Sequence, residues 1–178
     1  MTRDQSLVLV RWMADREVVL CGHLNRISRP PAIKNFFVFV SWLGDGKGWY
    51  LLMVSLPLIY GAKGWATFWN MFVIGVINLV LYKTIKNLTG RPRPGAVCEE
   101  ISLGAAPLDQ YSFPSGHTMH AVAFSLIACA HHPGLSVVLM PASALIALSR
   151  VVLGLHYPTD VIAGGLIGAY VASWFVPA

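Results

Sequence analysis

Residues 65–94 read WATFWNMFVIGVINLVLYKTIKNLTGRPRP, and this stretch decides the kind of fold that the chain can form. Its first part, Trp65–Ile85, is an apolar run long enough for a helix that crosses the hydrocarbon core of a membrane, which is roughly 30 Å thick. The run ends at Lys86, and Arg91 and Arg93 follow closely. The stretch therefore predicts a membrane helix that carries basic side chains to one membrane face.

The composition of the whole chain also indicates a membrane protein. Of its 178 residues, 56% are hydrophobic and 12% are charged, whereas a soluble domain averages about 25% charged residues. The net charge of +5 arises from 13 basic residues that are scattered along the chain, which argues against a nucleic-acid-binding surface. The length fits a single domain over 1–178. The N-terminal stretch carries charges within its apolar part, so we expect no signal peptide.

Five further apolar runs predict an all-α fold, a polytopic membrane helical bundle of about six transmembrane helices. The runs are Ile33–Leu43, Trp49–Tyr60, His117–Ala130, Leu135–Val152 and Tyr157–Val176. The first two are shorter than the ~20 residues of a full span, so we expect their ends to extend into flanking polar residues. A glycine-rich turn at 44–48 separates them.

The N-terminal segment 1–30 has a different pattern. Its apolar residues are interrupted by the charges of Arg11, Asp15, Arg16 and Glu17. Charge inside a membrane is costly, so this segment predicts an amphipathic helix that lies in the membrane interface. The transmembrane core would then occupy 31–178.

The distribution of basic residues predicts an orientation. If each run crosses once, everything before Ile33, the turns at 61–64 and 131–134 and the C-terminus share one side. That side carries Arg3, Arg11, Arg16, Arg26, Arg29 and Lys63. The positive-inside tendency then places both termini in the cytoplasm. We expect the bacterial cytoplasmic (inner) membrane, with the long connection 86–116 on its periplasmic or extracytoplasmic face.

Three polar segments, 86–94, 114–117 and 149–160, meet at that face. Each lies where a predicted span begins or ends. Together they gather charged and titratable residues from distant parts of the chain, among them Lys86, Arg93, His117, Arg150, His156 and Asp160. Such a cluster at a membrane face is by default a candidate functional site.

The residue types in this cluster favour a phosphate group. Lys86, Arg93 and Arg150 suit an anion with several oxygens, to which Arg makes paired hydrogen bonds. Ser115 and Gly116 begin a predicted helix, whose first N–H groups can point at an anion. A phosphoryl group in transfer spreads charge over its equatorial oxygens, which these groups would neutralise. We therefore predict a phosphate-binding site that needs no metal ion or other cofactor.

The two histidines and the aspartate suggest covalent catalysis. His156 and Asp160 are four residues apart at the start of the last helix, so they share a helix face. An Asp that accepts from one imidazole nitrogen leaves the other nitrogen free to attack phosphorus. We expect His156 to form a phosphohistidine. His117 would act as general acid on the leaving oxygen and then as base for water.

These segments resemble the type 2 phosphatidic acid phosphatase family, whose motifs are KxxxxxxRP, PSGH and SRxxxxxHxxxD in that order. Here they are Lys86 to Arg93-Pro94, Pro114 to His117, and Ser149-Arg150 to His156 to Asp160. The resemblance covers about 80–165, and the first 45 residues match nothing specific. It implies a helical bundle with an active site near the outer membrane boundary, and it assigns the same roles to the same residues.

The predicted activity is therefore hydrolysis of a lipid phosphomonoester or diphosphate, of the undecaprenyl diphosphate, phosphatidylglycerol phosphate, phosphatidic acid or lipid A type. The alternative is a lipid-to-lipid phosphotransferase, because only the acceptor would differ. A vanadium haloperoxidase shares such a phosphate site in a soluble setting, and the apolar runs argue against it. A transporter would need polar groups near the middle of the bilayer.

Other residues carry less information. The expected partners are the lipid phosphate substrate and membrane lipids, while the oligomeric state stays open. Cys21, Cys98 and Cys129 lack the spacing of a zinc site or disulfide framework. Arg91 lies outside the motif and is interpreted equally as a phosphate contact or a headgroup anchor.

Overall fold

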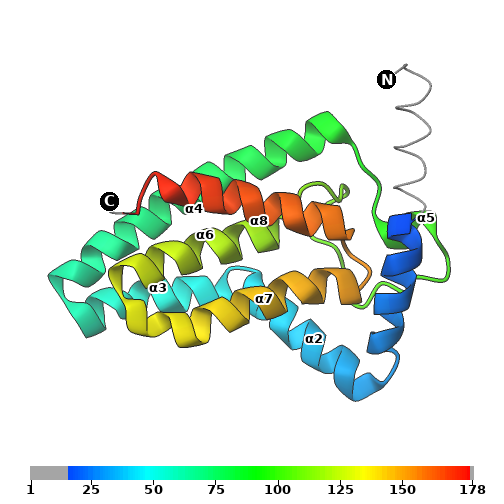
Figure 1. The fold of residues 1–178 in the computed structure, drawn as a ribbon, viewed down its shortest axis with the longest axis horizontal. Coiled ribbons are helices and arrows are strands. Elements are labelled where there is room, and N and C mark those ends of the chain that lie inside the picture. The colour runs from blue at the N-terminus through cyan, green and yellow to red at the C-terminus, as the bar shows by residue number, and fades with distance from the viewer. Residues whose placement is uncertain (1–15, 177–178) are drawn as a thin grey trace.

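The computed structural model describes residues 16–176, and these residues form helices, turns and one long loop, without strands (Figure 1). A first helix covers 16–25. It is followed by η1 (Arg26–Ser28), α2 (Pro31–Gly44), α3 (Lys47–Tyr60), α4 (Ala62–Thr89), α5 (Pro94–Val97), α6 (Gly116–His131), η2 (Pro133–Leu135), α7 (Ser136–Val152) and α8 (Pro158–Ser173). Each of the six predicted apolar runs is a helix, and the predicted all-helical fold is confirmed.

A glycine, a serine and a proline lie at the helix ends next to the polar motifs. Gly90 adopts φ +58° and donates its N–H to the carbonyl of Lys86, which ends α4 in the left-handed conformation that favours glycine. Ser115 is the N-cap of α6 and its side chain accepts the N–H of Thr118. Pro158 opens α8, where a missing N–H is tolerated. The helix ends therefore hold the motifs in place.

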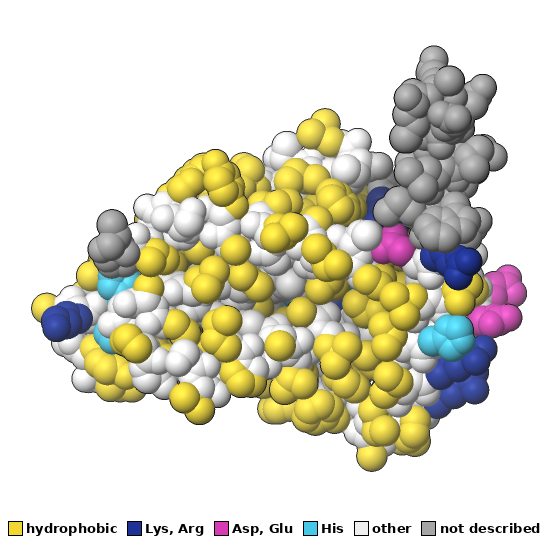
Figure 2. Space-filling model, viewed as in Figure 1, with side chains coloured by type: hydrophobic (Ala, Val, Ile, Leu, Met, Phe, Trp, Pro, Cys, Tyr) yellow, Lys and Arg dark blue, Asp and Glu magenta, His cyan; other side chains and the backbone are white. Residues whose placement is uncertain are grey.

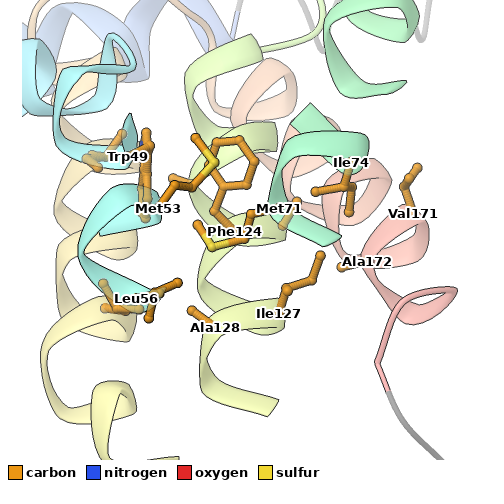
Figure 3. Packing of buried hydrophobic residues seen from close by; sticks show 14 of the residues in the cluster. Trp49, Met53, Leu56, Met71, Ile74, Phe124, Ile127, Ala128, Val171 and Ala172 are labelled. Carbon is orange, nitrogen blue, oxygen red and sulfur yellow. The ribbon is translucent and has the colours of Figure 1, made fainter. Parts of the chain in front are cut away.

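α6 is the central helix, in contact with α2, α4, α7 and α8. Against α8 the packing is very close: a Cβ on Gly164 would lie 2.5 Å from the carbonyl oxygen of Ser115. Small residues of this kind allow the backbones of membrane helices to touch. On its other side α6 packs through Phe124, which lies in the apolar core with Trp49 and Met53 of α3 (Figure 3).

The surface of the bundle is apolar around its middle. Figure 2 shows hydrophobic side chains over the middle of the visible face and charged side chains towards the two ends. Leu58 is 82% exposed, and Leu51 and Val137 are also exposed. Two helical segments, Ala62–Val97 and Pro133–Val152, are long and apolar enough to cross a membrane. Large exposed apolar areas of this kind are rare on soluble monomers.

The course of the chain before α3 differs from the predicted one. Asn25 donates a hydrogen bond of 2.9 Å to the carbonyl of Val152, at the end of α7. Gly44, at the other end of α2, packs against Ile146 and His117 near the same end of the bundle. Both ends of α2 thus lie where α7 ends and α6 begins. Five helices, α3, α4, α6, α7 and α8, run between the two ends of the bundle.

The prediction that the segment before Ile33 lies opposite to the polar motifs is therefore wrong. Hydrogen bonds from Asn25 and Ser28 to the carbonyl of Val152 hold this segment at the motif end. Residues 16–25 are helical, and the interfacial placement of the predicted helix over 1–30 stays a prediction. Its residues 1–15 lie outside the described part of the chain.

Candidate active site

The three motifs meet at one end of the bundle, around a cavity of about 660 Å³. α4 and α7 end there, and α6 and α8 begin there (Figure 1). The cavity is lined by six of the eight predicted site residues: Lys86, Arg93, Gly116, His117, Arg150 and His156. The other two, Ser115 and Asp160, are fully buried. Residues that are up to 74 positions apart in the printed sequence therefore form one site.

His156 lies between an acidic and a basic partner. Its Nδ1 is 3.5 Å from Oδ2 of Asp160, too long for a good hydrogen bond, and Nδ1 has no other partner among the described residues. Its Nε2 lies 3.3 Å from the guanidinium of Arg93. Oδ2 of Asp160 accepts the backbone N–H of Tyr157 at 2.9 Å. The carboxylate is thus fixed beside one nitrogen, and the other faces a predicted phosphate ligand.

The surroundings of His156 favour the neutral form of its imidazole. It is 1% exposed, and burial lowers its pKa well below the usual value. The positive charges of Arg150, Arg93 and Lys86 lower the pKa further. A neutral imidazole keeps the lone pair that an attack on phosphorus requires.

Lys86 and Arg93 share one carboxylate oxygen. Oδ1 of Asp109 accepts hydrogen bonds of 2.7 Å from Lys86 Nζ and of 2.7 Å from the guanidinium of Arg93. Burial raises the pKa of Asp109, but the hydrogen bonds and charges of the two cations outweigh it, so this pKa lies below its usual value. An anionic oxygen therefore already lies between the two cations, as a phosphoryl oxygen would. Asp109 was not among the residues predicted to form the site.

Ser115 contributes through the backbone of α6 in the described structure. Its hydroxyl lies 3.0 Å from the hydroxyl of Thr118, and its N–H donates to the carbonyl of Asp160 at 2.9 Å. Gly116 is the member of the pair that lines the cavity. The role of both as phosphate ligands stays a prediction.

Arg91 has three hydrogen-bond partners within the protein, which neither of its two interpretations anticipated. Its guanidinium donates to Oδ1 of Asp160 at 2.7 Å, to the hydroxyl of Thr159 at 2.8 Å and to Glu17 at 2.7 Å. It also stacks 4.0 Å from the ring centre of Tyr157. Glu17 accepts the N–H of Thr159 at 2.9 Å, which satisfies a free donor at the start of α8. Arg91 and Glu17 thus support the aspartate beside His156.

The turn after α2 supplies site residues that the sequence analysis missed. Asp45 contacts Nε2 of His117 through Oδ1, and Ser41 accepts a hydrogen bond from Arg150. The only sequence signal was the glycine-rich turn at 44–48, which is also typical of a simple connection.

Two histidines outside the site, His120 and His131, connect helices. His120 lies with its ring nitrogens 2.9 Å from the carbonyl of Gly116 and 3.3 Å from that of Gly75, so it connects α6 with α4. Nε2 of His131, at the end of α6, lies 3.2 Å from Nδ2 of Asn70 on α4. Among residues 16–176, no group of three or more His, Cys, Asp and Glu side chains could hold a metal ion.

Comparison with known proteins identifies the family. The profile of the PAP2 superfamily matches residues 64–178. The chain is 26% identical over 162 residues to the lipid A 1-phosphatase of Rhizobium etli, covering 80% of this chain and 69% of that protein. It is 30% identical over 134 residues to phosphatidylglycerophosphatase B of Bacillus subtilis, covering 66% of this chain and 60% of that protein. Other curated relatives match over about half of their length or less.

The fold leads to the same family. The crystal structure of Aquifex aeolicus LpxE superimposes with a TM-score of 0.75 at 26% sequence identity, covering 88% of this chain and 92% of that one. The family profile includes all three motifs around the cavity, from Lys86 to Asp160. The chain belongs to the PAP2 superfamily, the phosphatase family that its three motifs predicted.

Proposed function

We propose that this protein is an integral-membrane enzyme that hydrolyses the phosphomonoester or diphosphate of a lipid through a phosphohistidine on His156. One observation carries the proposal: the same cavity is lined by cationic and by apolar side chains. The cationic ones are Lys86, Arg93 and Arg150, and the apolar ones include Met53, Met71, Phe72 and Phe124. A lipid with a phosphorylated headgroup likewise combines a charged part and an apolar part.

In the first chemical step Nε2 of His156 attacks phosphorus. The new P–N bond forms as the P–O bond to the lipid breaks, and its electron pair stays on the leaving oxygen. That oxygen takes a proton from His117. Asp160 stabilises the imidazole of His156 as it becomes positively charged, which is the role of an aspartate beside a catalytic histidine.

In the second step water attacks the phosphohistidine. Neutral His117 takes a proton from the water, a P–O bond forms and the P–N bond breaks. Inorganic phosphate leaves and His156 is restored. During both steps Lys86, Arg93, Arg150 and the N–H of Gly116 would neutralise the charge on the equatorial oxygens.

Phosphate binding requires that Asp109 leave its position between Lys86 and Arg93. A phosphoryl oxygen carries the same charge and accepts the same hydrogen bonds, so it would replace the carboxylate without leaving either cation unpaired. Asp109 belongs to the loop between α5 and α6 and its side chain is 37% exposed. Its displacement therefore disturbs no helix of the bundle.

The orientation in the membrane is part of the proposal. As predicted, the catalytic end would face the periplasm and the C-terminus the cytoplasm. Arg16, Arg26 and Arg29 belong to the segment at the catalytic end of the bundle. In this orientation they would face the periplasm, whereas the positive-inside tendency favours basic residues in the cytoplasm. A fluorescent reporter fused after Ala178 tests the orientation, because it fluoresces only if the C-terminus is cytoplasmic. A dark fusion of normal abundance, together with an active alkaline phosphatase fusion at the same position, would reverse the orientation.

The test of function is phosphate release from a panel of lipid phosphates in detergent micelles containing EDTA. The panel consists of undecaprenyl diphosphate, phosphatidylglycerol phosphate, phosphatidic acid and a lipid A phosphate. His156→Ala should abolish release, while His23→Ala, a change at an exposed histidine with a local contact to Val19, should keep it. Full activity of His156→Ala would contradict the phosphohistidine. Transfer of label to an added acceptor lipid, without release, would favour the phosphotransferase.

A further inference from the structure

Outside the three family motifs, the segment from Ser41 to Gly46 also contributes to the site. α2 ends and α3 begins within this segment. The N–H of Asp45 donates to the carbonyl of Trp42 at 3.1 Å, and Gly46 then adopts φ +112°. This conformation strongly favours glycine, and it turns the chain sharply into α3. As a result Asp45 lines the cavity beside the catalytic groups.

This segment surrounds His117. Oδ1 of Asp45 contacts the Nε2 atom of the imidazole. A Cβ on Gly44 would lie 2.9 Å from Cγ2 of Ile146, which is too close, and 3.4 Å from Cδ2 of the same ring, which is an ordinary contact. The absence of a side chain at Gly44 therefore leaves room for Ile146, with the His117 ring beside it. Ser41, one helical turn earlier, accepts a hydrogen bond from Arg150. One short segment thus contacts both the predicted acid and a predicted phosphate ligand.

The contact restricts what His117 can do. A carboxylate accepts only, so it selects the form of the imidazole that carries hydrogen on Nε2. It also stabilises the imidazolium form, as an aspartate does for a catalytic histidine. The ring keeps its orientation while its other nitrogen, Nδ1, gains and loses a proton. His156 has Asp160 for the same purpose, so the site contains two separate His–Asp pairs.

We propose that Asp45 is a positioning residue for His117, holding its Nε2–H so that Nδ1 delivers the proton to the leaving oxygen. This inference rests on the proposed function. When the P–O bond to the lipid breaks, the leaving oxygen receives the proton of Nδ1, and His117 becomes neutral with its hydrogen on Nε2 still bound to Asp45. The attacking water later returns a proton to Nδ1.

The leaving group tests this role. Phosphatidic acid loses an alkoxide, which needs a proton as it departs. A nitrophenyl phosphate with a long alkyl chain loses a stable phenolate, which does not. General acid catalysis contributes about 10²–10⁴-fold, so Asp45→Asn should lower kcat/KM on phosphatidic acid by about 10²-fold and on the aryl phosphate by less than about threefold. The ratio kcat/KM is compared because it excludes the later attack of water, which both substrates share and in which His117 also takes part. The KM for phosphatidic acid should change little, because within residues 16–176 Asp45 hydrogen-bonds to His117 and to none of the predicted phosphate ligands.

Replacing Asp45 by Asn tests the hydrogen bond to His117 and not the shape of the side chain. The Asn side chain has the shape of Asp, but its amide nitrogen can donate to Nε2 and select the wrong form of the imidazole. Turnover of the aryl phosphate reports that the variant is folded and that His156 still reacts. Glu100→Gln serves as the control, because Glu100 is an exposed acid of the loop before α6 and should change neither rate.

A double-mutant cycle separates positioning from a general structural effect. If Asp45 acts through His117, then Asp45→Asn should cause no further loss with phosphatidic acid in a His117→Gln background. Equal losses on both substrates, additive losses in the cycle, or a gain in rate on both substrates would overturn the role of Asp45. Absence of His156-dependent release by the wild type from either substrate would instead overturn the proposed function, and this inference with it.

Discussion

The contact between Gly164 and the start of α6 allows a sharp prediction about the site. A Cβ on Gly164 would lie 2.5 Å from the carbonyl oxygen of Ser115, whereas carbon and carbonyl oxygen normally approach to about 3.3 Å. In Gly164→Ala, α8 and α6 must therefore separate by roughly 1 Å. The obstacle is a backbone atom, so no side-chain rotation can relieve the clash.

The separation would act directly on the catalytic groups. The N–H of Ser115 donates to the carbonyl of Asp160 at 2.9 Å across the same interface, and His117 lies on α6 just after Ser115. Moving the helices apart shifts His117 relative to His156. A misplacement of about 1 Å can cost roughly 10²-fold in rate, and overpacking of a core costs about 1–3 kcal/mol. We expect kcat/KM to fall by roughly 10²-fold and the thermal unfolding temperature to fall by several degrees.

Gly165→Ala is the matched control. A Cβ at this neighbouring position would lie 3.8 Å from Cγ2 of Thr118 and 3.8 Å from Cγ2 of Val122, both ordinary contacts. Activity should stay at the wild-type level, because nothing needs to move. Phosphate release and thermal unfolding in detergent are measured for both variants side by side. Wild-type activity in Gly164→Ala, or an equal loss in both variants, would refute the argument from helix separation.

Three further predictions concern the charged groups. Arg91→Ala should lower kcat about tenfold or more with little change in KM, since Asp160 loses a charge-assisted hydrogen bond worth about 1.5–3 kcal/mol; a changed KM with unchanged kcat would indicate a phosphate contact instead. Asp109→Asn should lower the unfolding temperature at pH 7. Because the pKa of Asp109 lies below its usual value in the folded protein, this stabilisation is present above the unfolded pKa of about 3.9 and is lost as the pH falls through the folded pKa. The difference between variant and wild type should therefore shrink below about pH 4, and a constant difference down to pH 3 would contradict the ion pair. Dialysis against EDTA should leave phosphate release intact, and a loss that Mg²⁺ restores would show that the three cations do not suffice.

Much of the fold could be read from hydrophobicity alone. Each of the six apolar runs is a helix in the structure, because a long apolar segment in a membrane must satisfy its own backbone hydrogen bonds. Hydrophobicity could not predict at which end of the bundle α2 begins. That end depends on hydrogen bonds from Asn25 and Ser28 to Val152, more than a hundred residues away.

The three motifs were enough to predict the family and the eight residues that gather at one end of the bundle, because the motifs have fixed spacing and lie at the ends of apolar runs. The groups that support these eight residues became visible only in the folded chain. Asp45 meets His117, Arg91 meets Asp160, and Asp109 lies between Lys86 and Arg93. Such pairs depend on which helix ends come within about 3 Å of one another, and that distance follows from packing, which no local pattern of residue types encodes.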